Sequence, residues 1–396
     1  MPKNQCAPVS VVGGNIAGLS AAWHLARLGI AVTVYESQIW NKPCGGAISC
    51  EFAGYLQQEL GVAPEGADHF VPGLRLSFAK NRVLDLPGFF VVTNRKDLQQ
   101  KLIRRLRREP NINFVFRRVS ISDHHLFSPQ TVLAAGFSGF SKQAMQEHWQ
   151  QMRRGIIYRF DGRVAKGPHP RRHLMVFDSR IKGYGWIFIG KDDHVNIGFG
   201  GLAAKERIRQ CYEDFLEHIV RCHGYYLRPP DPTPEGWKIP VVTRNWNYPV
   251  AFARNGVEFI GTGDALGLAH PVIGAGIEPA WQSGWLLAQC ADAQTGIINT
   301  EEYRRLLKHN LRLTCRSPVQ RLMTATAKSR GLPCKDVFGY LTARLTADHI
   351  IRTIQNYPWF AMVHDGRRKT GYSISVPGSL RRTPPAKPPE SAAESR

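Results

Sequence analysis

Three glycine-rich segments, far apart in the chain, contain residue types that could bind phosphate or contact a reactive ring. The first segment reads Gly13-Gly14-Asn15-Ile16-Ala17-Gly18. A dinucleotide-binding turn needs glycine where the chain turns tightly, where the backbone meets a pyrophosphate and where the next helix packs on a strand. Gly13 and Gly18 fill the first and third of these roles, and Asn15 stands at the second. A helix that begins near Asn15 directs its N-terminal amides and the positive end of its dipole at a phosphate.

The elements around this turn are those of a β-turn-α-β unit. Residues 8–13 read as a short buried strand, residues 16–29 have apolar positions at helical spacing, and residues 31–36 form a second strand. That strand ends in Glu36, 18 residues after Gly18. A carboxylate there can accept hydrogen bonds from the hydroxyls of an adenosine ribose. The unit therefore predicts nucleotide binding, with candidate contacts from Gly13, Gly14, Asn15, Ala17, Gly18 and Glu36.

The second glycine-rich segment lies more than 200 residues further along the chain. It reads Gly261-Thr262-Gly263-Asp264-Ala265, followed by His270-Pro271-Val272-Ile273-Gly274-Ala275-Gly276-Ile277. A strand ending in Gly263-Asp264 places a carboxylate where it can hold a ribityl hydroxyl. The later glycines open a helix, expected from about 274 to 291, whose amides can face the pyrophosphate or the pyrimidine end of a flavin. The two segments together predict FAD, with further candidate contacts from Asp264, Pro271, Gly274, Ala275, Gly276 and Ile277.

With these segments in place, the sequence resembles the FAD-dependent superfamily that includes para-hydroxybenzoate hydroxylase, and within it the geranylgeranyl reductases. The shared motifs extend from Val9 to about Gln289. Thr93-Asn94-Arg95-Lys96-Asp97-Leu98 is similar to the family's Arg-x-x-Leu helix start, which implies that Arg95 reaches the cofactor. The alternative is that Arg95 is a surface cation in the first turn of a basic helix. Leu133-Ala134-Ala135-Gly136-Phe137-Ser138 resembles the family's Asp-Gly-x-x-Ser motif, with Ala135 replacing the Asp, and implies a cofactor contact from Gly136.

The third glycine-rich segment resembles a loop of the reductase branch. Pro43-Cys44-Gly45-Gly46-Ala47-Ile48-Ser49 is similar to that branch's Pro-Cys-Gly-Gly loop beside the flavin. The resemblance implies cofactor contacts from Gly45, Gly46 and Ala47. Cys44 is the candidate catalytic residue, because a thiol there could be tuned by nearby cations or helix ends. The alternative is that Cys44 is a small packing residue.

A strand in the middle of the chain also resembles the reductase branch. Tyr184-Gly185-Trp186-Ile187-Phe188 is similar to its Tyr-x-Trp-x-Phe strand, which lines the substrate cavity, although Ile181 and Ile189 replace the flanking prolines. Alternate residues of a strand share one face of a sheet, so these three rings lie together. They form either a substrate-binding wall, suited to an extended isoprenoid, or ordinary sheet core.

These patterns predict an α/β fold with an α+β insertion. It combines a doubly wound, Rossmann-like FAD domain, an inserted antiparallel-sheet substrate domain and a C-terminal helical region. The FAD-binding domain is expected to be discontinuous, over residues 1–60, 90–155 and 245–298. The remaining segments are 61–89 and 156–244 for the substrate domain, 299–375 for the helical region and 376–396 for a disordered tail.

The composition is globular and strongly basic. The chain has 396 residues, a formal charge of +21 and a hydrophobic fraction of 43%. Residues 95–118 carry a net charge of +7, and residues 153–172 carry +6. Such a surface favours anionic partners, and we expect a small-molecule or lipid substrate, peripheral contact with an acidic membrane face, or an electron-donor protein. Nucleic acid is not expected, since no aromatic-basic motif or zinc-finger spacing accompanies the charge.

The chain shows no pattern for a membrane span, a secretion signal, a disulfide scaffold or a metal site. No 18 consecutive residues are apolar and uncharged, the first residues lack a signal pattern, and none of the eight cysteines is spaced Cys-x-x-Cys. A cytoplasmic protein is therefore expected, with peripheral contact to the inner membrane face as an extension of that expectation.

Ene reduction of an isoprenoid is the reaction that the resemblance implies. Reduced flavin would deliver hydride to one alkene carbon while a proton reaches the other, and NAD(P)H or a reduced protein carrier would supply the electrons. Two alternatives remain at this point. One is a flavin monooxygenase that hydroxylates an aromatic or other small molecule, and the other is a flavoprotein partner that modifies a peptide.

Overall fold

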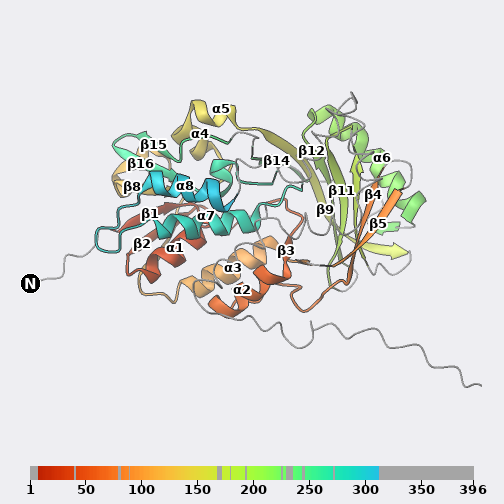
Figure 1. Cartoon of the computed structure of the whole chain (residues 1–396), viewed down its shortest axis with the longest axis horizontal. Helices are drawn as coiled ribbons and strands as arrows, with labels where there is room; N and C mark the ends of the chain where they lie inside the picture. The colour runs from red at the N-terminus through yellow and green to blue at the C-terminus, as the bar shows by residue number, and fades with distance from the viewer. Residues whose placement is uncertain are drawn as a thin grey trace, which may run out of the picture.

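The chain folds around two large sheets that lie side by side (Figure 1). The computed structural model describes residues 8–39, 42–78, 82–88, 90–166, 172–178, 180–191, 194–223, 226–228, 235–242, 246–270 and 273–311. The expectation for Pro271, the tail over 376–396 and most of the helical region over 299–375 lie outside these residues. Helix α8 (Thr300–Asn310) falls within the expected helical region.

The first sheet has six strands in the order β15-β16-β8-β1-β2-β7. Their bounds are β1 Val9–Val12, β2 Val32–Glu36, β7 Ile112–Phe116, β8 Gln130–Leu133, β15 Ala251–Arg254 and β16 Val257–Gly261. All neighbours run parallel except the edge strand β15, which is antiparallel to β16. Parallel strands buried on both faces account for the nearly continuous apolar run in β1, which is buried at all four positions.

Helices cover this sheet and join its distant segments. Their bounds are α1 Ile16–Arg27, α2 Cys50–Leu60, α3 Arg95–Leu106, α4 Gly139–Met145, α5 Glu147–Gln151 and α7 Ile277–Gln289, with short 3-10 turns η1 Ile121–Leu126 and η2 Gly263–Leu266. Small residues let α1 and α7 approach closely, since a Cβ added at Gly284 would lie 2.5 Å from the Ala17 carbonyl oxygen. In the structure, the helix expected over 274–291 is α7, which begins at Ile277 and ends at Gln289.

The second sheet has eight strands, in the order β13-β9-β12-β11-β10-β4-β5, with β14 also paired to β9. Their bounds are β4 Gly73–Phe78, β5 Arg82–Pro87, β9 Arg154–Lys166, β10 Arg172–Asp178, β11 Gly183–Ile189, β12 His194–Gly201, β13 Tyr226–Arg228 and β14 Glu235–Pro240. A small sheet pairs β3 (Ala47–Ser49) with β6 (Phe90–Val92). The second sheet is antiparallel, as expected, except that β4 runs parallel to β10.

Each face of the second sheet has its own core. Helix α6 (Lys205–His223) covers one face with buried Ile208, Phe215 and Ile219, and Figure 1 shows it on the outer side of the molecule. The other face carries Trp186 and Phe188 among a second apolar cluster. The predicted α/β class with a separate, largely antiparallel sheet is confirmed. The domain boundaries remain predictions, and β9 begins at Arg154, just before the expected start of the substrate domain.

Candidate functional site

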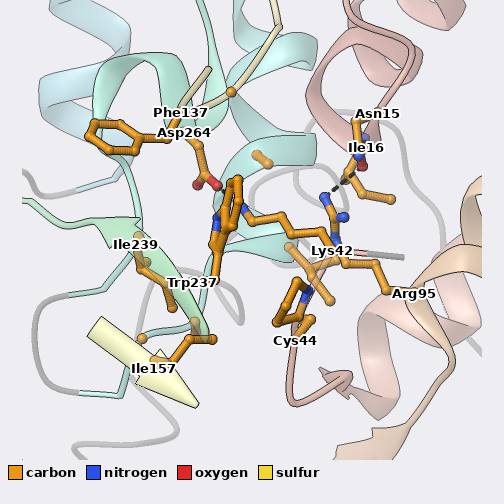
Figure 2. A pocket seen from close by; sticks show the side chains of 18 of the residues that line it. Asn15, Ile16, Lys42, Cys44, Arg95, Phe137, Ile157, Trp237, Ile239 and Asp264 are labelled. Atoms are coloured by element: carbon orange, nitrogen blue, oxygen red, sulfur yellow. Dashed lines mark hydrogen bonds and ion pairs between the residues drawn. The ribbon is translucent and has the colours of Figure 1, made fainter. Parts of the chain in front are cut away.

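A cavity of about 910 Å³ opens between the two sheets. Loops of the first sheet form one side, and strands β9, β10, β11 and β14 of the second sheet form the other. Figure 2 shows Asn15 and Arg95 on one side of it and Ile157 and Ile239 on the other. The lining includes predicted residues from all three glycine-rich segments: Gly13, Asn15, Ala17, Glu36, Cys44, Gly45, Gly46, Ala47, Arg95, Gly136, Asp264, Gly274, Ala275, Gly276 and Ile277.

The first glycine turn has the backbone that its sequence predicts. Gly13 has a φ of +107°, and a Cβ there would lie 2.5 Å from the Ala134 carbonyl oxygen, so only glycine fits. A Cβ at Gly18 would lie 1.9 Å from the Gly13 carbonyl oxygen, which accounts for glycine where helix meets strand. Gly14 and Gly18 lie behind the cavity rather than in its lining. Glycine at position 13 is therefore required by the close approach of the Ala134 backbone, and Gly13 lines the cavity at the turn.

Asn15, which stands where a dinucleotide-binding turn usually has its second glycine, is the N-cap residue of helix α1. Its Oδ1 accepts hydrogen bonds from the Ile16 amide at 2.8 Å and from Nη2 of Arg95 at 2.6 Å. Helix α1 has no acidic residue in its first turn, so the positive end of its dipole is not neutralised there. The Nη1 of Arg95 is buried and has no hydrogen-bond partner among the described residues. A helix start and an unpaired guanidinium nitrogen together suit an anionic ligand.

Glu36 lies at the end of β2, beside the same turn. Its Oε2 accepts a hydrogen bond from the Gly14 amide at 2.8 Å, and its Oε1 accepts one from the Gln38 amide at 3.2 Å. These bonds hold the carboxylate at the cavity edge, where it suits ribose hydroxyls.

Asp264 lies across the cavity in η2 and forms an ion pair with Nζ of Lys42. Both side chains are 15% exposed. Gly136 lies close by, since a Cβ on it would be 3.9 Å from the Asp264 Cβ. Lys42 was not among the predicted site residues. Its position next to the Pro-Cys-Gly-Gly segment is the only signal in the sequence that could have indicated it.

The loop before α7 closes the cavity at this end. Gly274 has a φ of +62°, and the His270 amide donates to the Ala275 carbonyl at 2.8 Å. The Nδ1 of buried His270 accepts a hydrogen bond from the Ile273 amide at 3.1 Å. Burial lowers the pKa of His270 to about 3, so its imidazole is neutral at physiological pH.

Glu278, in the first turn of α7, is a site residue that sequence reasoning missed. It lines the cavity and is 5% exposed. Its Oε1 accepts a hydrogen bond from the Ser49 amide at 2.6 Å, and its Oε2 has no partner among the described residues. Burial, with a smaller contribution from Glu51, raises the pKa of this carboxyl to about 7. No motif indicates this position, because an acid in a first helical turn is ordinarily a solvated dipole partner.

Tyr184, Trp186 and Phe188 lie together on the cavity side of β11. Neighbouring ring centroids are 5.7 Å and 5.9 Å apart. The Tyr184 hydroxyl donates to the Ile273 carbonyl at 2.5 Å, and burial raises its pKa well above the usual range. This bond joins the aromatic strand to the loop before α7.

The Cys44 loop rests on these rings. A Cβ on Gly45 would lie 3.1 Å from Cε2 of Phe188 and 3.4 Å from Nε1 of Trp186. Gly46 has a φ of +69°, and its amide approaches Sγ of half-buried Cys44 at 3.4 Å. The two motifs of the reductase branch, about 140 residues apart, are therefore in direct contact.

Other apolar side chains extend the aromatic wall. Ile157, Met175, Trp237 and Ile239 line the cavity from β9, β10 and β14. None of these four residues belongs to a motif, so the sequence predicted at most that they lie in strands and did not indicate that they line a cavity. Together with the rings of β11 they make this side of the cavity apolar, whereas the opposite side carries the glycine turns and charges.

The residues of the first side fit FAD. Gly13 lines the cavity at the turn, the start of α1 and Arg95 suit a pyrophosphate, and Glu36 suits an adenosine ribose. Asp264 and the start of α7 lie where the flavin end of the same molecule would be held. The fit rests on these geometries, and the apolar wall lines the same cavity.

The described part of the chain contains no group of three or more His, Cys, Asp or Glu side chains placed to hold a metal ion. Cys44, Cys50, Cys211, Cys222 and Cys290 are free thiols. None of the helices within the described ranges is long and apolar enough to cross a membrane.

Comparison with known proteins agrees with this geometry. Residues 11–72 match the family model of the NAD(P)-binding Rossmann-like domain. Geranylgeranyl diphosphate reductase of Rhodobacter capsulatus is 25% identical over 310 residues, covering 72% of this chain and 74% of that protein. Menaquinone reductase of Mycobacterium tuberculosis is 26% identical over 334 residues, covering 74% and 78%. The chain is thus similar to these reductases over about three quarters of its length. These matches confirm the resemblance to the geranylgeranyl reductases as a similarity of sequence.

Solved structures share the fold over almost the whole chain. A geranylgeranyl bacteriochlorophyll reductase-like protein from Thermoplasma acidophilum has a TM-score of 0.63 at 16% identity, covering 91% of this chain and 98% of that one. A triple mutant of the flavin-dependent brominase Bmp2 has a TM-score of 0.59 at 12% identity, covering 92% and 99%. Because both share this architecture, the fold by itself does not specify the reaction.

Proposed function

We propose that this oxidoreductase reduces double bonds of an isoprenoid chain, using FAD as its cofactor. The observation that carries the proposal is the contact between the Cys44 loop and the aromatic wall, made by Gly45 against Phe188 and Trp186. It joins the cofactor side of the cavity to an apolar surface made by residues of β9, β10, β11 and β14. Two curated relatives are named as reductases, and one of them as a reductase of geranylgeranyl diphosphate.

In the proposed reaction, one set of residues binds FAD and another set binds the substrate and excludes water. When bound and reduced, the flavin supplies a hydride, and the second alkene carbon takes a proton. Arg95, the start of α1 and Glu36 hold the nucleotide end, while Asp264 and the loop before α7 hold the other end. Tyr184, Trp186, Phe188, Trp237 and Ile157 align the alkene and exclude water, which orients the reacting groups. Cys44 stands between the two sides and is the candidate catalytic thiol.

Anaerobic turnover tests the proposal. The protein is loaded with FAD, reduced with dithionite without oxygen and incubated with geranylgeranyl diphosphate, and products are analysed by mass spectrometry. We expect the substrate to gain two hydrogens per reduced bond. Turnover that requires oxygen and inserts an oxygen atom would support the monooxygenase alternative. A stably bound polypeptide with no small-molecule turnover would support the peptide-modifying alternative.

The electron donor is proposed to be NAD(P)H or a reduced protein carrier. The described residues form one dinucleotide turn, at Gly13 to Gly18, and this turn belongs to the FAD side of the cavity. A nicotinamide donor would therefore act transiently. Stopped-flow reduction of the bound flavin by NADH, NADPH or reduced ferredoxin would identify the donor.

Anionic partners are proposed from the basic surface. Arg104, Arg107 and Arg108 are exposed at the end of α3, and Arg117 and Arg118 are exposed beside the cavity. These guanidinium groups could attract the phosphate of a prenyl substrate or an acidic membrane face. We expect co-sedimentation with vesicles of acidic lipid at low salt and release at high salt. Failure to bind at low salt, together with turnover that is indifferent to substrate phosphate, would remove this proposal.

A further inference from the structure

A polar network crosses the otherwise apolar wall of the second sheet and reaches the Cys44 loop. Its central residue is Asn196 on β12, which is 8% exposed. The Oδ1 of Asn196 accepts a hydrogen bond from Nε1 of Trp186 at 2.9 Å. Its Nδ2 donates to the Cys44 carbonyl at 3.0 Å and to Oδ1 of Asp161 at 3.2 Å. Asn196 thus uses both ends of its amide to join three distant segments.

The orientation of this amide is set by its neighbours. Trp186 offers only a donor, whereas the Cys44 carbonyl and the Asp161 carboxylate are acceptors. Asp161 is itself held by Nη2 of Arg159 at 2.5 Å, and Arg159, which is 7% exposed, also approaches Glu235 at 3.4 Å. The reverse amide orientation would bring two donors together at Trp186 and acceptors together at the other contacts. The amide of Asn196 therefore has one satisfied orientation in the Asn196 network, which comprises Arg159, Asp161, Asn196, Trp186 and Cys44.

The strand register explains how the network reaches Trp186. Trp186 pairs directly with Gly198 on β12, and Phe188 pairs with Asn196. A Cβ on Gly198 would lie 2.0 Å from Cζ2 of Trp186, so glycine there lets the indole lie against β12. In that position the indole N–H points to the Asn196 oxygen. Because the indole is fixed on one side by backbone and on the other by Gly45, small shifts of the Cys44 loop are opposed by direct packing.

We propose that Asn196 is a positioning residue that holds the Cys44 loop against the aromatic wall. Asn196 is not part of the cavity lining, so it acts through the Cys44 carbonyl and the Trp186 ring. The effect of Asn196 on turnover rests on the proposed function, whereas its effect on the position of the Cys44 loop does not. Loss of the hydrogen bond to the Cys44 carbonyl should let the loop leave the wall more often, and the Cys44 thiol should then react faster with reagents in solution.

The experiment compares Asn196→Asp with the double variant Asn196→Asp/Asp161→Asn in the full chain. Aspartate keeps an acceptor for Trp186 but cannot donate to the Cys44 carbonyl, and it also faces the Asp161 carboxylate. The double variant removes that repulsion, because the amide introduced at position 161 can donate to the carboxylate introduced at position 196. The carbonyl of Cys44 still lacks its donor. Comparison of the two variants therefore separates the effect on thermal stability from the effect on the position of Cys44.

Alkylation by iodoacetamide, followed at each cysteine by peptide mass spectrometry, gives the readout. We expect Cys44 to react about three- to tenfold faster in both variants, as loss of one hydrogen bond allows. Cys50 and buried Cys290 serve as internal references and should keep their rates. The melting temperature should fall in Asn196→Asp and recover in the double variant.

Two results would overturn the proposal. One is an unchanged Cys44 rate in the double variant, which would make Asn196 a purely structural residue. The other is recovery of both melting temperature and Cys44 rate, which would assign the effect to charge repulsion alone. If Asn196→Asp does not fold, the double variant still decides between these outcomes. Because alkylation needs no substrate, failure of the isoprenoid reductase function would appear only in turnover assays and would leave this test readable.

Discussion

The two sides of the cavity are built on different principles. On the nucleotide side, glycines, helix starts and single charged groups form the site, and backbone geometry decides which residues fit. On the wall side, strands contribute apolar side chains whose identity matters less than their volume and their face of the sheet. The nucleotide side should therefore be sensitive to the smallest backbone changes, whereas the wall side should respond gradually. The following substitutions test that difference, from the largest expected effect to the smallest.

Gly13→Ala should produce the largest effect. The positive φ of +107° and the 2.5 Å approach to the Ala134 carbonyl leave no room for a methyl group. We expect FAD affinity to fall by at least about 100-fold, since the backbone must move where the pyrophosphate approaches. Gly54→Ala on α2 is the matched control, because its Cβ would meet nothing within 4 Å. That control should retain FAD and gain roughly 0.5–1 kcal/mol of stability. Equal FAD binding by both variants, measured by fluorescence titration, would contradict the backbone argument.

Glu278→Gln tests whether the nucleotide side holds an uncompensated acid. Asp85 and Asp178 of the second sheet, by contrast, are ion-paired and lie outside the cavity lining. The pKa of Glu278 is raised from 4.5 to about 7, so the folded chain keeps a proton that the unfolded chain loses in this range. The associated stability is present below about pH 4.5 and is lost as the pH rises through about 7, by at most about 3 kcal/mol.

Urea unfolding at pH 5 and pH 8 measures this difference. Glutamine can still accept the hydrogen bond from the Ser49 amide but carries no proton to lose, so the variant should lack this part of the pH dependence. Other titrating groups are common to both proteins and cancel in the comparison. Identical pH slopes for wild type and variant would show that Glu278 is charged or exposed throughout.

Arg95→Met should weaken the hold on the nucleotide without unfolding the chain. It removes the guanidinium that bonds Asn15 and would face the pyrophosphate. We expect FAD to bind roughly ten- to 100-fold more weakly, the value of one or two charge-assisted hydrogen bonds. Lys96→Met is the control, because Lys96 is exposed at the next position of α3. An effect of similar size in both variants would mean that general positive charge, not the Arg95 contact, holds the cofactor.

Trp237→Ala should give the smallest and most selective effect. Its ring extends the apolar wall from β14, opposite the nucleotide loops. We expect KM for a long isoprenoid to rise about tenfold, with FAD affinity unchanged, since one large side chain of several is removed. Tyr226→Ala is the control, because Tyr226 is 51% exposed on β13. Loss of FAD binding in Trp237→Ala would show that the two sides are not energetically separate.

The same contrast explains what could be predicted from sequence. Gly13, Gly18 and Glu36 sit in a local β-turn-α-β unit, where spacing along the chain corresponds to spacing in the structure. Asp264 and Gly276 were also predictable, because each follows or precedes an element of recognisable pattern. Strands β1 and β2 and helices α1 and α7 were expected within a few residues for the same reason.

The wall side and the buried polar groups could not be found in this way. Ile157, Met175 and Ile239 are apolar residues in strands. The alternation of apolar residues along a strand does not indicate which face of the sheet lines a cavity and which face packs on a helix. The Asn196 network depends on the register among β9, β11 and β12 and on a contact between Asn196 and Cys44, which are 152 positions apart. Arg159 and Asp161, two positions apart on β9, offer a faint signal, since charges at alternate positions of a strand are unusual in a core.

The close packing of α1 on α7 has a consequence for how this protein could be divided or recombined. The segment that matches the Rossmann-like family model, residues 11–72, contains α1 but not the helix that covers it. Excised from the rest, α1 would expose the small-residue surface around Ala17 and Ala21 that Gly284 approaches. The familiar nucleotide motif is therefore not a transferable module in this chain. A fragment or chimera would need to contain residues 257–289 as well. To transfer the nucleotide site to another protein, both distant segments would have to be exchanged together.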